Sequence, residues 1–153
     1  MILLISTALL AFSTAFYTPA DPVPATVKDT FSKLYPSVDE AEIFWECNQQ
    51  GIVATFENQR ALTKAFFDAA GTWQESHIRL YLNQMPIAIQ QLLKKHLRET
   101  DITFMGKVVF PDGSHLFRVE SEDFDEVVIK LLDQQGGLVE ERHIPFTEGL
   151  EVW

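Results

Sequence analysis

Two copies of one residue pattern make up most of the chain, and this internal repeat constrains the fold more than any other feature. Each copy opens with an apolar residue followed by proline, Val23-Pro24 in the first and Met85-Pro86 in the second. Each copy also contains a tight turn, at residues 67–71 and again at residues 132–136. Because helices and sheets must bury their apolar faces against each other, the repeat predicts two similar units that share one sheet.

A short amphipathic helix is expected at the start of each copy. Pro24 suits the first turn of a helix, where its missing N–H removes no hydrogen bond. Val27, Phe31 and Leu34 follow at helical spacing and form one apolar face. Pro36 ends this helix because it restricts the preceding residue. In the second copy, Pro86, Ile89 and Leu93 stand at a constant offset from Pro24, Val27 and Phe31.

After each predicted helix the apolar period changes to about two residues, which is typical of strands. The pattern predicts strands at about 41–48, 51–57, 61–68, 72–80, 101–110, 114–121, 124–133 and 137–145. Plausible hairpin turns lie at 49–51, at Asn58-Gln59 and at Pro111-Asp112-Gly113. Connections this short require antiparallel neighbours, because a parallel pair needs a long crossover.

The fold class expected from these elements is α+β. Two tandem helix-plus-four-strand repeats form one antiparallel sheet of about eight strands with both helices on one face. The repeats are expected at 23–82 and 83–146, within a single domain over 23–153 that ends in a short C-terminal tail. The other face of the sheet then has no sequence element left to cover it, apart from the tail after Pro145.

The first residues of the chain resemble an export signal. Ile2 to Phe12 is an almost unbroken apolar run with the length of a signal-peptide core, and Ser13-Thr14-Ala15 supplies small residues for cleavage. We therefore expect a signal peptide at 1–15, cleavage near Ala15, an extended leader at 16–22 and a periplasmic or secreted protein. No Lys or Arg precedes this apolar run, although signal peptides usually have a basic residue near their start. A buried N-terminal strand or helix is therefore the alternative.

The net charge of −10 excludes some partners. Nucleic acids require a basic surface, so neither DNA nor RNA is expected to bind. Anionic lipid head groups are disfavoured for the same reason, and no membrane-spanning segment is expected in the mature chain. The acidity permits a basic partner but does not require one.

The residues capable of catalysis or metal binding form no recognisable site in the sequence. His77, His96, His115 and His143 show no metal-ligand spacing, and no nucleophile motif, phosphate-binding loop or dinucleotide fingerprint is present. Acidic runs at 39–46 and 120–126 lack the glycine of a calcium loop, so they are expected to be solvated. Cys47, the only cysteine, is expected to be buried and inert. No cofactor and no metal are therefore expected.

Several of these features resemble the PepSY-like proteins exported by Bacteroidetes. The matching segments of the first copy are Val23-Pro24, 31–36 (Phe-Ser-Lys-Leu-Tyr-Pro), 67–71 (Phe-Asp-Ala-Ala-Gly) and Trp73. Those of the second copy are Met85-Pro86, Lys94-Lys95, Leu132-Asp133 and Gly136. The second copy departs from the pattern because no Tyr-Pro follows its helix and Gly137-Leu138 replaces Thr72-Trp73.

The resemblance implies a tandem repeat with the fold of the beta-lactamase inhibitor protein, without catalytic residues. It also implies that the residue before the turn aspartate faces the helices, which places Phe67 in the core. Strand parity then places Phe66 on the open face, with Leu62 and Lys64. Phe44 has the parity opposite to Trp45 and is a further open-face residue. Trp45 and Phe31 are expected in the core.

The function expected from this reasoning is a non-enzymatic binding module that uses the open face of the sheet, in the manner of a protein or peptidase inhibitor. Its expected partner-binding residues are Phe44, Leu62, Lys64 and Phe66, and its partner is an unspecified protein or peptide. The alternative is a small-ligand carrier or an enzyme with a cavity between the helices and the sheet. A second copy of the chain, or the C-terminal tail, could also cover the open face.

Overall fold

The computed structural model of the protein describes residues 23–48, 51–96, 102–123 and 125–145. The predicted signal peptide, its cleavage near Ala15 and the leader at 16–22 lie outside the described residues, as does the C-terminal tail from 146 to 153. None of the helices in the described ranges is long and apolar enough to cross a membrane.

The first repeat consists of one helix, a short 3-10 helix and four strands. These elements are α1 (Ala25–Leu34), η1 (Glu40–Glu42), β1 (Phe44–Asn48), β2 (Gly51–Asn58), β3 (Ala61–Phe67) and β4 (Trp73–Arg79). Helix α1 follows Pro24, whose carbonyl accepts the first backbone hydrogen bonds from Val27 and Lys28. The first strand begins at Phe44 rather than near residue 41, because the Asp39 side chain accepts a hydrogen bond from the Ala41 N–H and caps η1.

The second repeat also has one α-helix followed by four strands, but its 3-10 helix precedes the α-helix. Its elements are η2 (Leu82–Gln84), α2 (Ile87–His96), β5 (Ile102–Val109), β6 (His115–Asp123), β7 (Glu126–Leu132) and β8 (Leu138–Pro145). All strands join one antiparallel sheet in the order β1-β2-β3-β4-β5-β6-β7-β8, so every strand pairs with its sequence neighbours. The predicted α+β class and the predicted eight-stranded sheet are confirmed.

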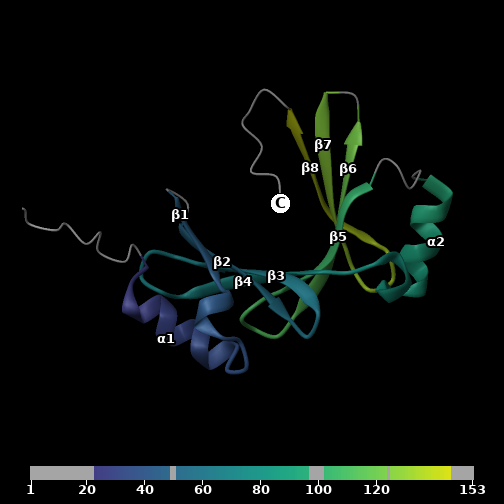
Figure 1. The fold of residues 1–153 in the computed structure, drawn as a ribbon. Helices are drawn as coiled ribbons and strands as arrows, with labels where there is room; N and C mark the ends of the chain where they lie inside the picture. Colours follow the sequence, from purple (N-terminus) through teal and green to yellow (C-terminus); the bar gives the residue numbers. More distant parts are fainter. Residues whose placement is uncertain (1–22, 49–50, 97–101, 124, 146–153) are drawn as a thin grey trace, which may run out of the picture.

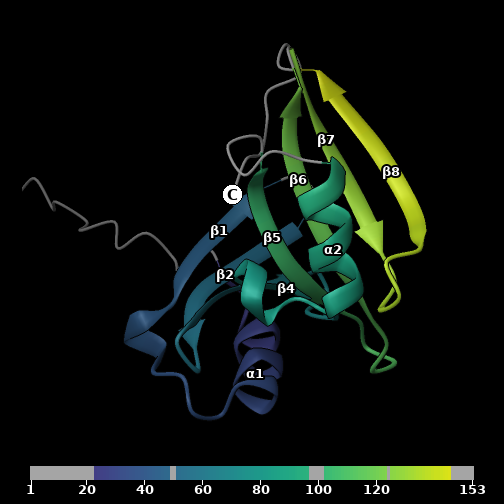
Figure 2. The same cartoon turned by 90° about the vertical axis from the view of Figure 1, so that its right-hand side faces the viewer.

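Both helices pack on the same face of this sheet, as predicted. The face can be followed across the repeats by register, because Thr63 pairs with Ile78, Ile78 with Lys107 and Lys107 with Phe117. Thr63 belongs to the strands under α1, and Phe117 lies in the cluster under α2. The sheet is strongly bent, so that β5 to β8 stand steeply to β1 to β4, with α1 and α2 outside the bend (Figures 1 and 2).

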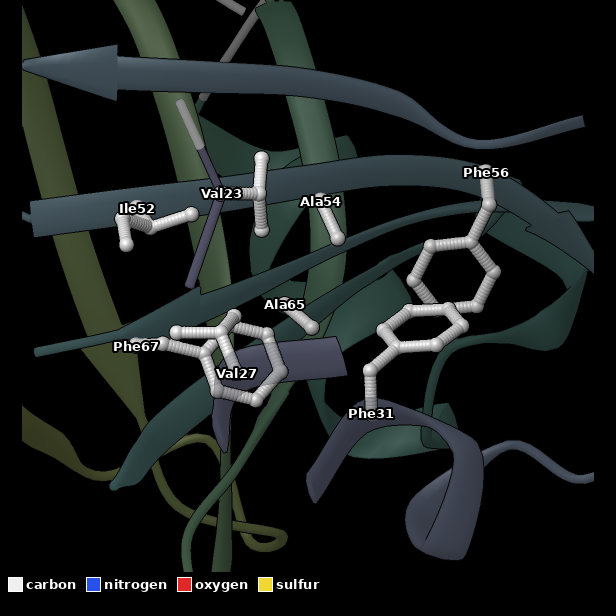
Figure 3. Close-up of a cluster of buried hydrophobic side chains, with 8 residues drawn as sticks. All are labelled: Val23, Val27, Phe31, Ile52, Ala54, Phe56, Ala65 and Phe67. Carbon is white, nitrogen blue, oxygen red and sulfur yellow. The ribbon is translucent and has the colours of Figure 1, made fainter. Parts of the chain in front are cut away.

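The core of the first repeat is an aromatic cluster between α1 and the sheet (Figure 3). Phe31 of α1 is 2% exposed, and its ring contacts those of Phe56 and Trp45 at centroid distances of 4.8 and 5.4 Å. Phe67 is also 2% exposed and lies in the same cluster. The predicted core positions of Phe31, Trp45 and Phe67 are thus confirmed, with Trp45 partly buried at the margin.

The second repeat has its own, less aromatic core. Ile89 and Leu93 of α2 pack with Met85, Phe117, Val119 and Leu132, and all six side chains are buried.

A pair of polar hydrogen bonds strengthens the core of the first repeat. The Tyr35 hydroxyl donates to Ser76 Oγ at 2.6 Å, and the Trp73 indole donates to the same oxygen at 2.9 Å. Because these buried polar groups have hydrogen-bond partners, their burial does not destabilise the core.

The closing turns of the two repeats have the same hydrogen bonds. Asp68 Oδ1 accepts from the N–H groups of Ala70 and Thr72 at 2.9 and 2.8 Å. Asp133 Oδ1 accepts from those of Gln135 and Gly137 at 2.9 and 2.7 Å. Hydrogen bonds to the ionised carboxylate hold the pKa of Asp68 below its ordinary value, chiefly through Thr72. These side-chain contacts explain why the turn aspartate recurs in both copies.

Candidate functional site

The open face of the sheet, opposite the helices, carries the residues expected to bind a partner. Register places three of them close together on the first repeat. Phe44 pairs with Thr55, and Thr55 pairs with Lys64 on the next strand. Phe66 lies two residues along β3 from Lys64 and therefore points to the same side. Leu62, on the other side of Lys64, pairs with Glu57.

Exposure separates these residues into two pairs. Phe44 is 65% exposed and Leu62 is 40% exposed, whereas Lys64 and Phe66 are half-buried. Large apolar side chains at such exposure on one face leave apolar surface in contact with water. We call Phe44, Leu62, Lys64 and Phe66 the first-repeat patch.

Beside the first-repeat patch lies a buried polar network that the sequence did not predict. His77 of β4 is only 3% exposed and its ring lies against that of Phe66, with the centroids 4.6 Å apart. Its Nε2 is 2.7 Å from Glu75 Oε1, and its Nδ1 is 3.4 Å from a terminal nitrogen of Arg118. Since a guanidinium can only donate, this arrangement fits a neutral imidazole that donates from Nε2 and accepts at Nδ1.

The electrostatics of the network agree with a neutral histidine. Burial lowers the pKa of His77, although the hydrogen bond to Glu75 opposes this effect. The hydrogen bond from His77 lowers the pKa of Glu75, so its carboxylate stays ionised near neutral pH. Burial also lowers the pKa of the Arg118 guanidinium, whose Nε lies 2.6 Å from Glu120 Oε1. Two carboxylates and one guanidinium therefore surround an uncharged imidazole.

The position of Glu120 corrects one expectation from the sequence. Glu120 was expected to be solvated with its acidic neighbours, but it is only 3% exposed. The reason is its place on β6, where it pairs with Phe104 and Ile129 on the buried part of the open face. The sequence does contain a signal for this network. Glu75 and His77 are two residues apart on one strand and therefore share a face of the sheet, and the same holds for Arg118 and Glu120.

The open face of the second repeat differs from that of the first. Phe104, Val108, Val127 and Ile129 point to this side of the sheet and are all buried. Gly106 contributes to this burial, because the Phe104 ring occupies the space that a side chain at position 106 would fill. The expectation of an uncovered face therefore holds only for the first repeat, where Phe44 and Leu62 are exposed.

Two further expectations concern thiol and metal chemistry. Cys47 is exposed, which corrects the expectation that it is buried. It shares strand parity with the half-buried Trp45, but β1 is an edge strand and parity there does not guarantee cover. Among the described residues, no group of three or more His, Cys, Asp or Glu side chains is arranged to hold a metal ion.

Cavities are present on the helix-bearing face. One of about 300 Å³ lies between α2 and the sheet and is lined by apolar side chains and Lys130. The other, of about 520 Å³, lies where the two repeats meet and has a mixed polar and apolar lining. Neither is lined by any member of the first-repeat patch. A further cavity of about 760 Å³, around the tip of the β2–β3 hairpin, is lined by Leu62 of the patch together with Glu57 and Arg79.

Comparison with known proteins shows what the fold resembles. No protein-family model matches the sequence, and no curated protein matches it significantly. Among solved structures, a BLIP-like protein from Bacteroides fragilis NCTC 9343 is similar with a TM-score of 0.70 and 23% identity, covering 89% of this chain and 95% of that one. A DUF2874 family protein from Bacteroides uniformis ATCC 8492 is similar with a TM-score of 0.67 and 19% identity, covering 84% of this chain and 99% of that one.

A third structure, from Bacteroides eggerthii DSM 20697, is of a protein named as a candidate periplasmic one. It has a TM-score of 0.68 and 16% identity, and the match covers 84% of this chain and 99% of that one. At these identities the likeness is one of fold. The chain thus has a BLIP-like fold of the kind found in Bacteroides proteins, built from two repeats on one bent sheet.

Proposed function

We propose that this protein is an exported, non-enzymatic binding module that holds a protein partner against the first-repeat patch. The observation that carries the proposal is the exposure of Phe44 and Leu62, at 65% and 40%, on the face opposite α1 and α2. Exposed aromatic and aliphatic residues grouped on one face are typical of surfaces that another protein covers. We include Lys64 and Phe66 in the contact because they share this face.

The partner is a different protein that presents an apolar side chain flanked by basic groups. Glutamates outnumber basic residues on the open face, as strand register assigns it: Glu46, Glu57, Glu75, Glu120, Glu122 and Glu140 against Lys64, Arg79, Arg118 and Arg142. At low ionic strength, where screening is weak, the net charge of −10 acts in the same direction at longer range. Such complementarity favours a basic partner and speeds its association.

The buried network supports this role through rigidity. His77 is held between Glu75 and Arg118 and lies against Phe66, so this part of the patch contacts side chains with defined positions. A binding surface that is already ordered loses less conformational entropy on association. The patch would therefore act as a preformed surface rather than one assembled on binding.

Export and family are part of the same proposal. The apolar run at 2–12 and the small residues up to Ala15 support a signal peptide. A periplasmic or secreted location fits the similar protein that is named as a candidate periplasmic one. The BLIP-like neighbour is named for an inhibitor fold, and an inhibitory role toward a protein or peptidase is the form of binding we favour. Membership of the PepSY-like proteins rests on the sequence resemblance.

Partner capture with matched variants tests the proposal. Purified wild-type protein, Phe44→Asp and Ile87→Asp are immobilised and exposed to the envelope extract of the native host. Ile87 is the control because it is 73% exposed on α2, away from the open face. We expect a discrete protein to be retained by the wild type and by Ile87→Asp and lost with Phe44→Asp. Retention by Phe44→Asp, or capture of nothing by the wild type, would contradict the proposal.

A further inference from the structure

The cavity between the repeats lies on the face opposite the first-repeat patch. It has a volume of about 520 Å³, within the usual range for small-molecule sites. Its floor is one row of the helix-bearing face, where Ile78 pairs with Lys107 and Lys107 pairs with Phe117. Its walls are the β2–β3 hairpin, the segment around η2 and the turn before β8. We call it the junction pocket; its lining residues are Asn58, Gln59, Ala61, Ile78, Leu80, Gln84, Met85, Pro86, Lys107, His115, Phe117 and Gln134.

We propose that the junction pocket binds a small carboxylate that carries an amide and an apolar side chain, the chemistry shared by an acylated amino acid and the C-terminus of a peptide. This inference goes beyond the proposed function, because it concerns another face and another class of ligand. It rests on the charge, the amide groups and the apolar floor of the pocket.

The charge of the lining is opposite to that of the protein as a whole. The chain has 22 acidic residues against 12 lysines and arginines, yet none of the described lining residues is acidic. Lys107 and His115 are the basic groups, on neighbouring strands of the floor. Lys107 forms no ion pair with any residue in the described ranges. An unpaired ammonium beside uncharged polar groups favours an anion, and at physiological salt the distant acidic surface is largely screened.

Side-chain amides supply further donors and acceptors. Asn58, Gln59, Gln84 and Gln134 reach the pocket from three different segments. Gln84 Oε1 accepts from the Tyr81 N–H at 2.7 Å, so its NH2 group is left to donate. Amides of this kind match both the carboxylate and the amide of the proposed ligand. A simple inorganic anion would leave most of them unused.

The apolar part of the lining sets the third requirement. Phe117 of the floor and Met85 of the wall are 6% and 3% exposed, and Ile78 and Leu80 also line the pocket. The Phe117 ring also contacts the His115 ring edge-on, at a centroid distance of 5.6 Å. A ligand that fills the pocket therefore gains from an apolar side chain as well as from its carboxylate.

The β2–β3 hairpin forms one wall of the junction pocket through its two-residue tip. Its tip residues, Gln59 and Arg60, have φ angles of 50° and 66°, a left-handed backbone that Asn and Gly adopt more easily. Positive φ at both tip residues is the geometry that a two-residue hairpin loop requires. Gln59 lines the junction pocket, and Arg60 lines the adjoining hollow with Leu62, Arg79 and Tyr81.

Titration with a defined probe tests the inference. N-acetyl-phenylalanine is added to 15N-labelled protein, and the dissociation constant is taken from amide shift changes, with N-acetyl-phenylalaninamide as the uncharged comparison. The variants are Lys107→Gln and the matched control Lys94→Gln, since Lys94 is an exposed lysine of α2 outside the pocket. We expect saturable binding with shifts centred on the junction pocket, weakened at least tenfold by Lys107→Gln and by the amide probe, and unchanged by Lys94→Gln.

Several results would overturn the inference. Absence of saturable binding, shifts centred elsewhere, or equal affinity for the acid and the amide would overturn the inference. Unchanged affinity in Lys107→Gln would do the same, provided that its amide spectrum shows a folded protein. N-acetyl-glycyl-glycyl-phenylalanine distinguishes the two sources: tighter binding than the single amino acid indicates a peptide C-terminus, and equal or weaker binding indicates a free acylated amino acid.

Discussion

The phenyl ring of Phe66 lies against the imidazole of His77, with the ring centroids 4.6 Å apart. Phe66 belongs to β3 and His77 to the neighbouring β4, and both side chains are on the open face. This contact removes part of Phe66 from water and shields one side of His77. Phe44 has no such cover and remains 65% exposed. The first-repeat patch therefore has a supported part and a freely accessible part.

Consecutive phenylalanines should differ in their contribution to stability. Phe67→Ala removes a ring that is 2% exposed within the aromatic core, which is expected to cost about 3–5 kcal/mol. Phe66→Ala removes a half-buried ring and should cost less, about 1–2 kcal/mol. Chemical denaturation of both variants measures the difference. Equal losses would mean that the open face at Phe66 is core, and the patch would have to be redefined.

His77 and His143, which both contact carboxylates, should have pKa values shifted in opposite directions. Burial lowers the pKa of His77 from its ordinary value of 6.5. Hydrogen bonds to Glu126 and Glu141 raise the pKa of His143, which is exposed. NMR titration of the imidazole nitrogens should thus find His77 still neutral when His143 is largely protonated. Protonation of His77 before His143 would contradict the neutral tautomer assigned to the network.

The lowered pKa of His77 also makes the stability of the fold depend on pH. Below about pH 6.5 the unfolded chain protonates residue 77 more readily than the folded protein does, so the free energy of unfolding falls as the pH falls. His77→Gln keeps a donor for Glu75 and removes this titration. Denaturation at pH 7 and pH 5 should therefore show a smaller loss for His77→Gln than for the wild type. A loss of the same size would mean that His77 does not contribute.

Sequence reasoning succeeded where a residue's role depends on its own strand or helix. The periodicity around Val27 and Phe31 predicted α1, and strand parity placed Phe66 and Phe67 on opposite faces. It failed where the role depends on contacts between distant strands. The burial of Glu120 beside Arg118, and their approach to His77, depend on the pairing of β4, β5 and β6 and on the bend of the sheet. The exposure of Cys47 likewise follows from β1 being an edge strand, which periodicity does not reveal.

The strained hairpin tip offers a stabilising substitution. Arg60 has a φ of 66°, a conformation that costs a residue with a side chain more than it costs glycine. Arg60→Gly should raise the free energy of unfolding by about 0.5–1 kcal/mol, because the relief of strain exceeds the added entropy of the unfolded chain. Arg60→Ala is the control: it also removes the guanidinium but keeps the Cβ. A gain in the alanine variant equal to that of glycine would indicate an electrostatic cause.

Gly106 is expected to tolerate no side chain. A Cβ at this position would lie 2.6 Å from the Ile78 carbonyl oxygen and 2.5 Å from Phe104 Cζ. Because one of these neighbours is backbone, Gly106→Ala should destabilise the fold by about 1–3 kcal/mol. Thr103→Ala on the same strand removes an exposed side chain and should stay within about 0.5 kcal/mol of the wild type. Thermal denaturation that finds Gly106→Ala as stable as Thr103→Ala would show that the sheet adjusts freely here.

Site-specific photo-crosslinking in the native host tests the central claim, that the first-repeat patch holds a protein partner. A benzophenone amino acid is placed at Phe44 or at Leu62 of the open face, and at Ile87 or Val139 as controls that are 73% and 56% exposed. The account predicts that positions 44 and 62 give the same crosslinked partner, identified by mass spectrometry as a protein other than this chain, and that positions 87 and 139 do not. Crosslinking to a second copy of the chain, equal yields from the control positions, or no adduct at 44 and 62 would contradict it.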